Sequence, residues 1–264
     1  MDLVGNHTRK LKSIHDSLLN FVNESRATPP CSRPCQLFLG NPKTGHRGKI
    51  TELDLKASAE LIHNFSLPVF VHAAYCINLS DPIGKKDPSD TQWALGLLKE
   101  DLKTTCQLGG RGVVVHVGKS KTQSVEAAAQ KMFDSIREVL PFATEDCPLL
   151  LETPAGQGTE LLVTIEEFVS FYKRFSDDDQ KVFKLCVDTQ HVFSAGYDPF
   201  QYLQTFTDIF GVASVPLIHL NDSDVPQGAC ADRHKRLGTG HIPIKTLEQV
   251  IEWASARQIP MVIE

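Results

Sequence analysis

The chain has 264 residues, of which 41% are hydrophobic, and its formal net charge is -5. A chain of this length can bury a full core, as one large α/β domain or as two small ones. The acidic balance excludes a uniformly basic nucleic-acid binder, although it allows a local basic rim. No run approaches the ~18 apolar residues of a membrane span, and the N-terminus lacks the apolar stretch of a secretory signal.

Seven cysteines are scattered along the chain without a Cys-x-x-Cys pair. An odd number in this arrangement fits reduced thiols better than a disulfide framework. We therefore expect an intracellular protein that has no membrane partner. The sequence does not separate a cytoplasmic from a nuclear location.

Short apolar runs alternate with longer amphipathic segments over the whole length. The apolar runs predict eight strands: Leu3–Gly5, Cys35–Leu39, Pro68–His72, Gly112–Val117, Pro148–Glu152, Val182–Asp188, Pro216–Leu220 and Pro260–Glu264. Between them, apolar residues recur every three or four positions, which predicts helices that include 52–65, 91–109, 124–140, 164–175, 199–211 and 243–256. Helix starts are indicated at Thr51, at Ser89 and Asp90, and at Thr164.

Continuous apolar strands separated by helices are typical of parallel strands covered on both faces. Eight strands with seven intervening helices predict one domain over residues 1–264, a (β/α)8 TIM barrel that lacks its final helix because the sequence ends at Glu264. A doubly wound open sheet is the structural alternative. No GxGxxG motif follows the first strand, which weakens the dinucleotide-binding form of that alternative.

Most of the predicted strands end in a residue that can bind a metal ion. These residues are His72, His116, Glu152, Asp188, His219 and Glu264. In a barrel of this kind, the chemistry gathers at the carboxyl ends of the strands. A single histidine on an apolar strand is more often a hydrogen-bonded core residue than a ligand. Several such residues together would each need a buried partner, and bound cations supply one by neutralising the carboxylates and accepting the imidazole lone pairs.

Two further pairs extend this set of ligands. His191 follows Asp188 by three positions, and the spacing of Asp232 and His234 puts both side chains on one side of an extended segment. Taken alone, the Asp-Arg-His stretch is also typical of a solvated loop. Nitrogen and oxygen donors without cysteine suit zinc, and also manganese or iron. About nine ligands are enough for two or three ions, which can act together on one phosphoryl group.

Blocks of the sequence, in this order, resemble the endonuclease IV family of apurinic/apyrimidinic endonucleases, which are xylose-isomerase-like TIM barrels. The blocks span nearly the whole chain and read "VGNH", "HAAYCINL", "VHVGKS", "LLETPAGQG", "CVDTQHVFSAGYD", "IHLNDS", "DRHKRLGTG" and the final "VIE". The resemblance implies a TIM barrel with three zinc ions per chain, with manganese as an alternative at one site.

The resemblance also implies how the ligands are shared. The first zinc ion would be bound by His72, His116 and Glu152. The second would be bound by Glu152, Asp188, His219 and Glu264, with Glu152 bridging the two ions and serving as the catalytic carboxylate. The third would be bound by His191, Asp232 and His234.

The activity implied by the resemblance belongs to base excision repair. It is hydrolysis of the phosphodiester 5′ to an abasic site in double-stranded DNA, which leaves a 3′-hydroxyl and a 5′-deoxyribose phosphate. Removal of blocked 3′ ends, as a 3′-phosphatase or 3′-phosphodiesterase, would be a secondary activity. The resemblance favours a monomer.

DNA contacts are implied by the same resemblance. Asn41, Lys43 and Tyr75 match positions that wedge the DNA helix open. Lys43 stands where the bacterial pattern carries Arg, and lysine keeps the charge but lacks the planar stacking surface. Cys76 replaces a larger apolar residue. The basic rim expected to contact phosphates comprises Lys43, Arg47, Lys49, Lys119, Lys121, Arg233, Lys235 and Arg236.

Two other functions fit part of the pattern. A sugar isomerase or epimerase shares the barrel and some ligands but needs only one or two ions. The trio His191, Asp232 and His234, together with Tyr75, argues against it. A non-catalytic protein that binds damaged DNA is the second alternative, although such a protein would not need the complete set of ligands.

Overall fold

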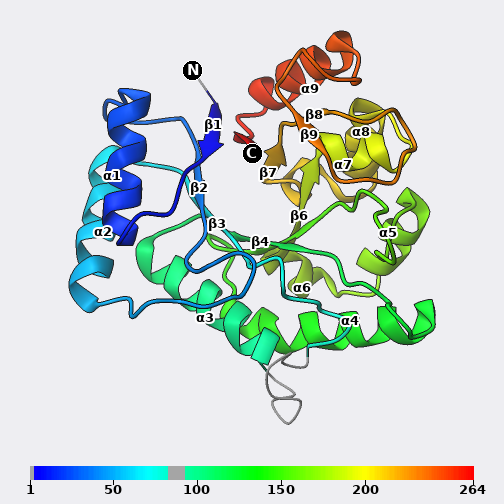
Figure 1. The fold of residues 1–264 in the computed structure, drawn as a ribbon, viewed down its shortest axis with the longest axis horizontal. Coiled ribbons are helices and arrows are strands. Elements are labelled where there is room, and N and C mark those ends of the chain that lie inside the picture. The colour runs from blue at the N-terminus through cyan, green and yellow to red at the C-terminus, as the bar shows by residue number, and fades with distance from the viewer. Residues whose placement is uncertain (1–2, 83–92) are drawn as a thin grey trace.

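The structure, a computed structural model, describes residues 3–82 and 93–264 (Figure 1). Eight parallel strands form a closed barrel, because β1 (Val4–His7) pairs with β2 (Cys35–Leu37) on one side and with β10 (Met261–Ile263) on the other. Around the barrel, the order is β1-β10-β7-β6-β5-β4-β3-β2. The predicted TIM barrel is therefore confirmed, and the open-sheet alternative is wrong.

The remaining elements follow the predicted alternation. The other barrel strands are β3 (Val69–His72), β4 (Val113–His116), β5 (Leu149–Glu152), β6 (Phe183–Asp188) and β7 (Leu217–His219). The longer helices are α1 (Ile14–Ser25), α2 (Glu52–Phe65), α3 (Trp93–Leu108), α4 (Val125–Val139), α8 (Pro199–Phe210) and α9 (Ile244–Ala256). These helices lie around the outside of the barrel (Figure 1).

Helix starts agree with the capping residues where the structure describes them. The Thr51 side chain accepts a hydrogen bond from Asp54 N at the start of α2. Thr164 and Glu167 form a reciprocal capping box at the start of α5 (Ile165–Tyr172). The predicted caps Ser89 and Asp90 lie outside the described residues.

Two short helices and one pair of short strands were not predicted. A second helix, α6 (Asp177–Val182), follows α5, so the strand predicted to start at Val182 begins one residue later. Another helix, α7 (Thr189–Ser194), starts directly after β6, where the Asp188 side chain caps it. Finally, β8 (Asp222–Ser223) and β9 (His234–Lys235) form a separate antiparallel pair. Short elements of this kind depend on capping and tertiary contacts more than on hydrophobic periodicity.

The interior of the barrel holds an apolar layer of its own. It comprises Phe70, Val114, Leu150, Cys186, Leu217 and Val262. Each of these residues lies two positions before one of the predicted strand-end ligands. Because strand side chains alternate between two faces, residues two apart point the same way. The apolar layer therefore lies beneath the ligands and fixes the direction in which they point.

No helix within residues 3–82 and 93–264 combines the length and the apolar content needed to cross a membrane.

We predict that Leu150→Ala destabilises the fold, because Leu150 is fully buried inside the barrel and its truncation leaves a cavity. The expected loss in the free energy of unfolding is about 2–5 kcal/mol, measured by urea denaturation. Leu53→Ala is the matched control, since the Leu53 side chain on α2 is 78% exposed and should change stability by less than about 0.5 kcal/mol. Equal midpoints for the two variants would contradict the role given to the inner layer.

Candidate metal centre

The buried carboxylate of Glu152, at the end of β5, faces three imidazoles. Its Oε2 lies 3.2 Å from His72 Nε2 and 3.0 Å from His116 Nε2. Its Oε1 lies 2.9 Å from His219 Nδ1. Glu152 itself is 1% exposed. The closed barrel thus brings the ends of β3, β4, β5 and β7 to one carboxylate.

The ionisation of these groups is set by their neighbours. Burial raises the pKa of Glu152, but the charges of His116 and His219 outweigh burial and hold that pKa well below its usual range. Burial lowers the pKa of His72, whereas the hydrogen bond and charge of Glu152 raise it, and the net effect is an increase. Burial likewise lowers the pKa of His191, but the charges of Asp188, Glu152 and Asp232 and the hydrogen bond with Asp232 together raise it well above its usual range. Positive charge is therefore strongly favoured beside these carboxylates.

Hydrogen bonds fix which ring nitrogen of each imidazole is free. His72 Nδ1 lies 2.7 Å from the carbonyl oxygen of Ala73, and His191 Nδ1 lies 2.8 Å from that of Thr153. A carbonyl oxygen only accepts, so both nitrogens carry protons. In the neutral form of each ring, Nε2 is therefore the nitrogen whose lone pair can bind a cation.

Asp188 links two groups of metal-binding atoms. One group contains Glu152, Asp188, His219 and Glu264, and a second contains Asp188, His191 and His234. Within each group, the donor atoms lie within 4.8 Å of one another. The Asp188 Oδ2 atom is 3.8 Å from His219 Nδ1 and 3.7 Å from His234 Nε2. A third group, His72, His116 and Glu152, shares Glu152 with the first.

Asp232 lies next to the group of His191 and His234. Its Oδ1 is 3.5 Å from His191 Nε2 and 3.4 Å from His234 Nε2. The structure therefore places all nine residues predicted as ligands at one end of the barrel. The difference from the predicted sharing is that Asp188 borders the His191 group as well as the His219 group.

Two ring nitrogens that make no hydrogen bond among the described residues indicate whether cations fit this centre. His191 Nε2 and His234 Nε2 are buried and have no hydrogen-bond partner within residues 3–82 and 93–264. Buried polar atoms are rarely left unpaired, because losing water without replacement is costly. Imidazole nitrogens and carboxylate oxygens are donors that zinc prefers, and here they gather within 4.8 Å of one another in each group. The residues present therefore fit a cluster of divalent ions.

Sequence reasoning missed the residues that orient the ligands. Gln36, in the middle of β2, is fully buried; its Oε1 lies 2.8 Å from His219 Nε2, and its Nε2 donates to Glu264 Oε1 at 2.7 Å. His7, at the end of β1, lies 3.2 Å from the same Glu264 oxygen through Nδ1. His7 ends its strand as the ligands do, but the predicted first strand stopped at Gly5, and Gln36 lies one residue before the end of β2. A rule based on predicted strand ends would therefore have selected neither residue.

Asn221 is a further orienting residue that follows β7. Its Nδ2 donates to Asp188 Oδ2 at 2.7 Å, and its Oδ1 accepts from Glu264 N at 3.0 Å. One amide thus holds ligands from two different strands. It lies two residues beyond the last ligand of its strand, so no strand-end rule would select it.

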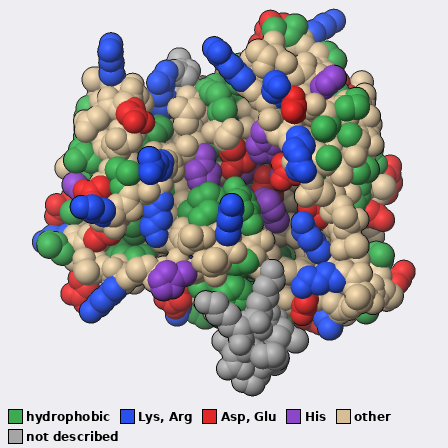
Figure 2. All heavy atoms as spheres, viewed as in Figure 1, with side chains coloured by type: hydrophobic (Ala, Val, Ile, Leu, Met, Phe, Trp, Pro, Cys, Tyr) green, Lys and Arg blue, Asp and Glu red, His purple; other side chains and the backbone are tan. Residues whose placement is uncertain are grey.

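The exposed residues predicted to contact DNA lie beside this centre. Tyr75 is 52% exposed, and its ring centroid lies 5.4 Å from that of His116. Lys43 is exposed on a turn, where the Asn41 side chain accepts hydrogen bonds from Lys43 N and Thr44 N. Arg233 is exposed and donates to Gln157 Oε1 at 3.3 Å. Figure 2 shows histidine and acidic side chains in a hollow of one face, with Lys and Arg side chains around it.

The expected basic rim needs one correction. The Arg47 side chain is only 15% exposed and is paired with Asp101 at 2.9 Å, so it is not available as a surface phosphate contact. Other members of the rim keep exposed side chains but have acidic partners: Lys119 with Glu160, Lys121 with Asp81, and Lys235 with Asp224. An acidic partner reduces the positive charge that each lysine presents.

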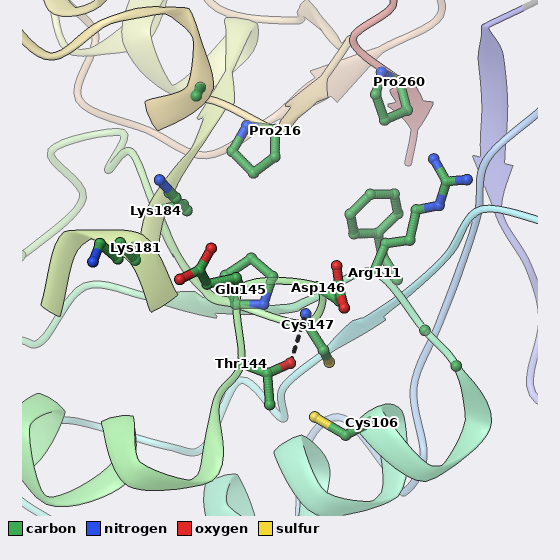
Figure 3. A pocket seen from close by; sticks show the side chains of 15 residues that line it. Cys106, Arg111, Thr144, Glu145, Asp146, Cys147, Lys181, Lys184, Pro216 and Pro260 are labelled. Carbon is green, nitrogen blue, oxygen red and sulfur yellow. Dashed lines mark hydrogen bonds between the residues drawn. The ribbon is translucent and has the colours of Figure 1, made fainter. Parts of the chain in front are cut away.

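A separate cavity lies at the other end of the barrel. It has a volume of about 900 Å³ and is lined by residues that precede strands, among them Pro148, Pro216 and Pro260, and by Lys184 and Glu145 (Figure 3). The metal-binding groups lie where the same strands end. This cavity is therefore separate from the candidate centre, and it contains none of the nine predicted ligands.

Comparison with known proteins agrees with this geometry. The sequence model of a family described as "Xylose isomerase-like TIM barrel" matches residues 35–264. A protein named "Probable endonuclease 4" from Oceanobacillus iheyensis is 29% identical over 233 residues, which cover 86% of this chain and 76% of the relative. The protein of the same name from Bacillus subtilis is 28% identical over 233 residues, with the same shares covered.

Solved structures show the same fold. Endonuclease IV from Thermus thermophilus superposes with a TM-score of 0.78 at 24% identity, covering 99% of this chain and 91% of that chain. A D-tagatose 3-epimerase-like protein reaches a TM-score of 0.70 at 16% identity, covering 98% and 88%. The barrel alone is thus common to proteins with different names. Because the family model covers most of the sequence, the chain belongs to the xylose isomerase-like TIM barrels, and its predicted resemblance to the endonuclease IV family is confirmed.

Proposed function

We propose that this chain is a zinc-dependent apurinic/apyrimidinic endonuclease of DNA repair. It hydrolyses the phosphodiester 5′ to an abasic site in double-stranded DNA and leaves a 3′-hydroxyl and a 5′-deoxyribose phosphate. Removal of 3′-phosphate or other 3′-blocking groups is a secondary activity of the same centre. The observation that carries the proposal is the set of three adjoining groups of metal-binding atoms, joined through Glu152 and Asp188.

Three zinc ions would be held by the nine ligands. The first ion would be bound by His72, His116 and Glu152. The second would be bound by Glu152, Asp188, His219 and Glu264. The third would be bound by His191, Asp232 and His234, beside Asp188. When bound, the ions lower the pKa of a water molecule and neutralise charge on the phosphate oxygens.

The protein's own part is to orient these ligands before the substrate arrives. Gln36 holds the His219 ring and the Glu264 carboxylate, while Asn221 holds Asp188. The carbonyl oxygens of Ala73 and Thr153 fix the rings of His72 and His191. Such outer contacts keep each ligand in one tautomer and one orientation. Hydrolysis can then proceed with little rearrangement of the centre.

DNA recognition is proposed to use the exposed side chains next to the metal centre. An abasic nucleotide lacks base stacking, so turning it out of the duplex costs less than flipping an intact nucleotide. The Tyr75 ring packs against the rings of His72 and His116, with a centroid distance of 5.4 Å to each. It can fill the space that the displaced nucleotide leaves in the duplex. Lys43 and Arg233 provide positive charge on neighbouring loops. The protein is proposed to act as a monomer.

A sugar epimerase is the alternative that shares this barrel. The group of Asp188, His191 and His234 favours the nuclease, because an epimerase needs only one or two ions. Incubation with a duplex carrying one abasic site, with and without a zinc chelator, separates the two. Cleavage that the chelator abolishes supports the nuclease. Epimerisation of ketoses without cleavage of DNA would support the alternative.

We predict that Glu152→Gln lowers the rate of cleavage by at least about a hundredfold, because it removes the charge shared by two groups of ligands. DNA binding should change little, since the exposed basic residues remain. Cleavage is measured on the abasic duplex under single-turnover conditions, and binding by fluorescence anisotropy. Glu126→Gln, at the exposed start of α4, is the control and should behave as the parent chain. Loss of binding in the Glu152 variant would mean that the metal centre itself holds the phosphate.

We predict that two aspartates differ in how much zinc their loss removes. Asp232→Ala should lose about one ion per chain, because the ion pairs of Asp232 within the described residues are with His191 and His234. Asp188→Ala should lose more than one, because Asp188 borders two groups. Zinc per chain is measured by inductively coupled plasma mass spectrometry after dialysis. The same zinc content in both variants would contradict the shared position of Asp188.

We predict that zinc affinity falls as the pH decreases, and that the fall begins above the ordinary histidine pKa of about 6.5. Without metal, burial lowers the pKa values of His72 and His191, but the neighbouring carboxylates together outweigh burial and raise both values. Protons therefore compete with zinc at a higher pH than they would for an isolated histidine. Competition with a fluorescent chelator across the neutral range checks this, and a fall confined to lower pH would contradict it.

A further inference from the structure

We propose that the largely buried ion pair of Arg47 and Asp101 is a positioning element for DNA binding, because it holds the exposed turn Asn41–His46 beside Tyr75. The inference rests on the proposed function in one respect, namely that this turn meets the DNA. Neither member of the pair belongs to the metal centre. Their effect would be transmitted through the turn, and through Lys43 at its tip.

The ion pair is largely buried and has a defined geometry. Arg47 Nη2 lies 2.9 Å from Asp101 Oδ1, and the two side chains are 15% and 3% exposed. The same guanidinium nitrogen donates to the carbonyl oxygen of Leu97 at 2.8 Å. Asp101 and Leu97 both belong to α3, so Arg47 ties its own loop to one turn of a barrel helix.

The charge of Asp101 depends on this partner. Burial raises the pKa of Asp101 to about 7, although the Arg47 guanidinium opposes the rise. Removing either partner would leave the other buried without compensation, which is costly. The two residues therefore act as a unit.

Hydrogen bonds make the turn itself compact. Asn41 N donates to His46 O at 2.8 Å, and Gly45 N donates to Asn41 O at 2.8 Å. The Asn41 side chain closes the inside of the turn through Lys43 N. Arg47 follows the closing residue His46 directly, so an anchor at Arg47 fixes the turn as one body.

The underside of the turn packs on α3 and on the loop that carries Tyr75. Gly45 has a φ of +67°, and a Cβ there would lie 2.5 Å from Leu97 Cδ1 and 3.4 Å from Cys76 Sγ. A Cβ on Gly40 would lie 2.8 Å from Arg47 Cγ, so the arginine side chain runs close beneath the chain. Side chains larger than hydrogen are excluded at both glycines. The turn therefore packs against Cys76, which follows Tyr75 in the chain.

Stability alone gives little reason for such a pair. Replacing a buried ion pair by apolar side chains is often neutral for stability, whereas the pair specifies one geometry. Here, the geometry that it specifies is the position of an exposed lysine relative to an exposed tyrosine. The property expected to depend on the pair is therefore affinity for DNA.

Two variants test the proposal. Asp101→Asn removes the charge with little change of shape, and Arg47→Met combined with Asp101→Leu removes both charges so that neither is left unpaired. We expect KM for the abasic duplex to rise about tenfold in both, which corresponds to about 1.4 kcal/mol of binding free energy. The kcat for the duplex, the zinc content and the hydrolysis of bis(4-nitrophenyl) phosphate should stay within about twofold, because this small phosphodiester does not reach the turn.

Two comparisons assign the effect to the turn. Glu138→Gln breaks the exposed pair of Glu138 with Lys99, 2.7 Å apart, and should leave KM unchanged. Lys43→Ala should raise KM as Asp101→Asn does, and combining the two should add little, since both act through Lys43. An unchanged KM in both pair variants overturns the proposal. An equal loss of activity on the small phosphodiester also overturns it, because that result indicates general disruption.

Amide hydrogen exchange provides a readout that does not depend on cleavage. Exchange at Lys43, Thr44 and Gly45 should become at least about tenfold faster in the pair variants and remain unchanged in Glu138→Gln. If the parent chain fails to cut abasic DNA, the proposed function fails, while this exchange result still decides whether the pair holds the turn. Equal exchange rates in all variants would overturn the positioning role.

Discussion

The structure depends on the burial of one carboxylate, Glu152, among several imidazoles. A carboxylate removed from water is stable only when positive charge or hydrogen-bond donors replace the lost solvent. Here, His72, His116 and His219 lie within 3.2 Å of its oxygens. Protonated imidazoles can supply the positive charge, but metal ions do so better because they also satisfy the unpaired ring nitrogens. The buried carboxylate and the ring nitrogens without hydrogen bonds in the described part of the chain reduce the stability of the protein without metal, and the same groups can bind cations.

The apolar layer beneath the ligands fixes the positions of the ligand side chains in this cluster. Leu150 lies two positions before Glu152, and Cys186 two positions before Asp188, so a shift of register by one residue would turn core and ligands away together. Close packing of this layer also excludes water from below. Charges above a dry layer interact more strongly than they would in water. The stability of the barrel and the chemistry at its mouth are therefore built from alternate residues of the same strands.

Much of this arrangement could be predicted from the sequence, because it follows from strand periodicity. The six strand-end ligands could be identified from single residues after apolar runs, since parallel strands of a barrel bring their carboxyl ends together. The helix that follows Asp188, and the pair β8 and β9 that carries His234, could not be identified in this way. Both depend on contacts between distant segments, as does the orienting role of Asn221. Likewise, the sequence alone suggests that Arg47 is a surface cation, and only the position of α3 shows that it is largely covered and paired with Asp101.

Net charge is a poor guide to partners when carboxylates are ligands. The chain carries a formal charge of -5, yet Glu152, Asp188 and Glu264 all face metal-binding atoms at the mouth of the barrel. Three divalent ions would add six positive charges and make the formal balance positive. Those charges would lie in the hollow where a phosphate must enter. An acidic protein can therefore present a positive site to a polyanion, because the sign that matters is local and depends on the bound ions.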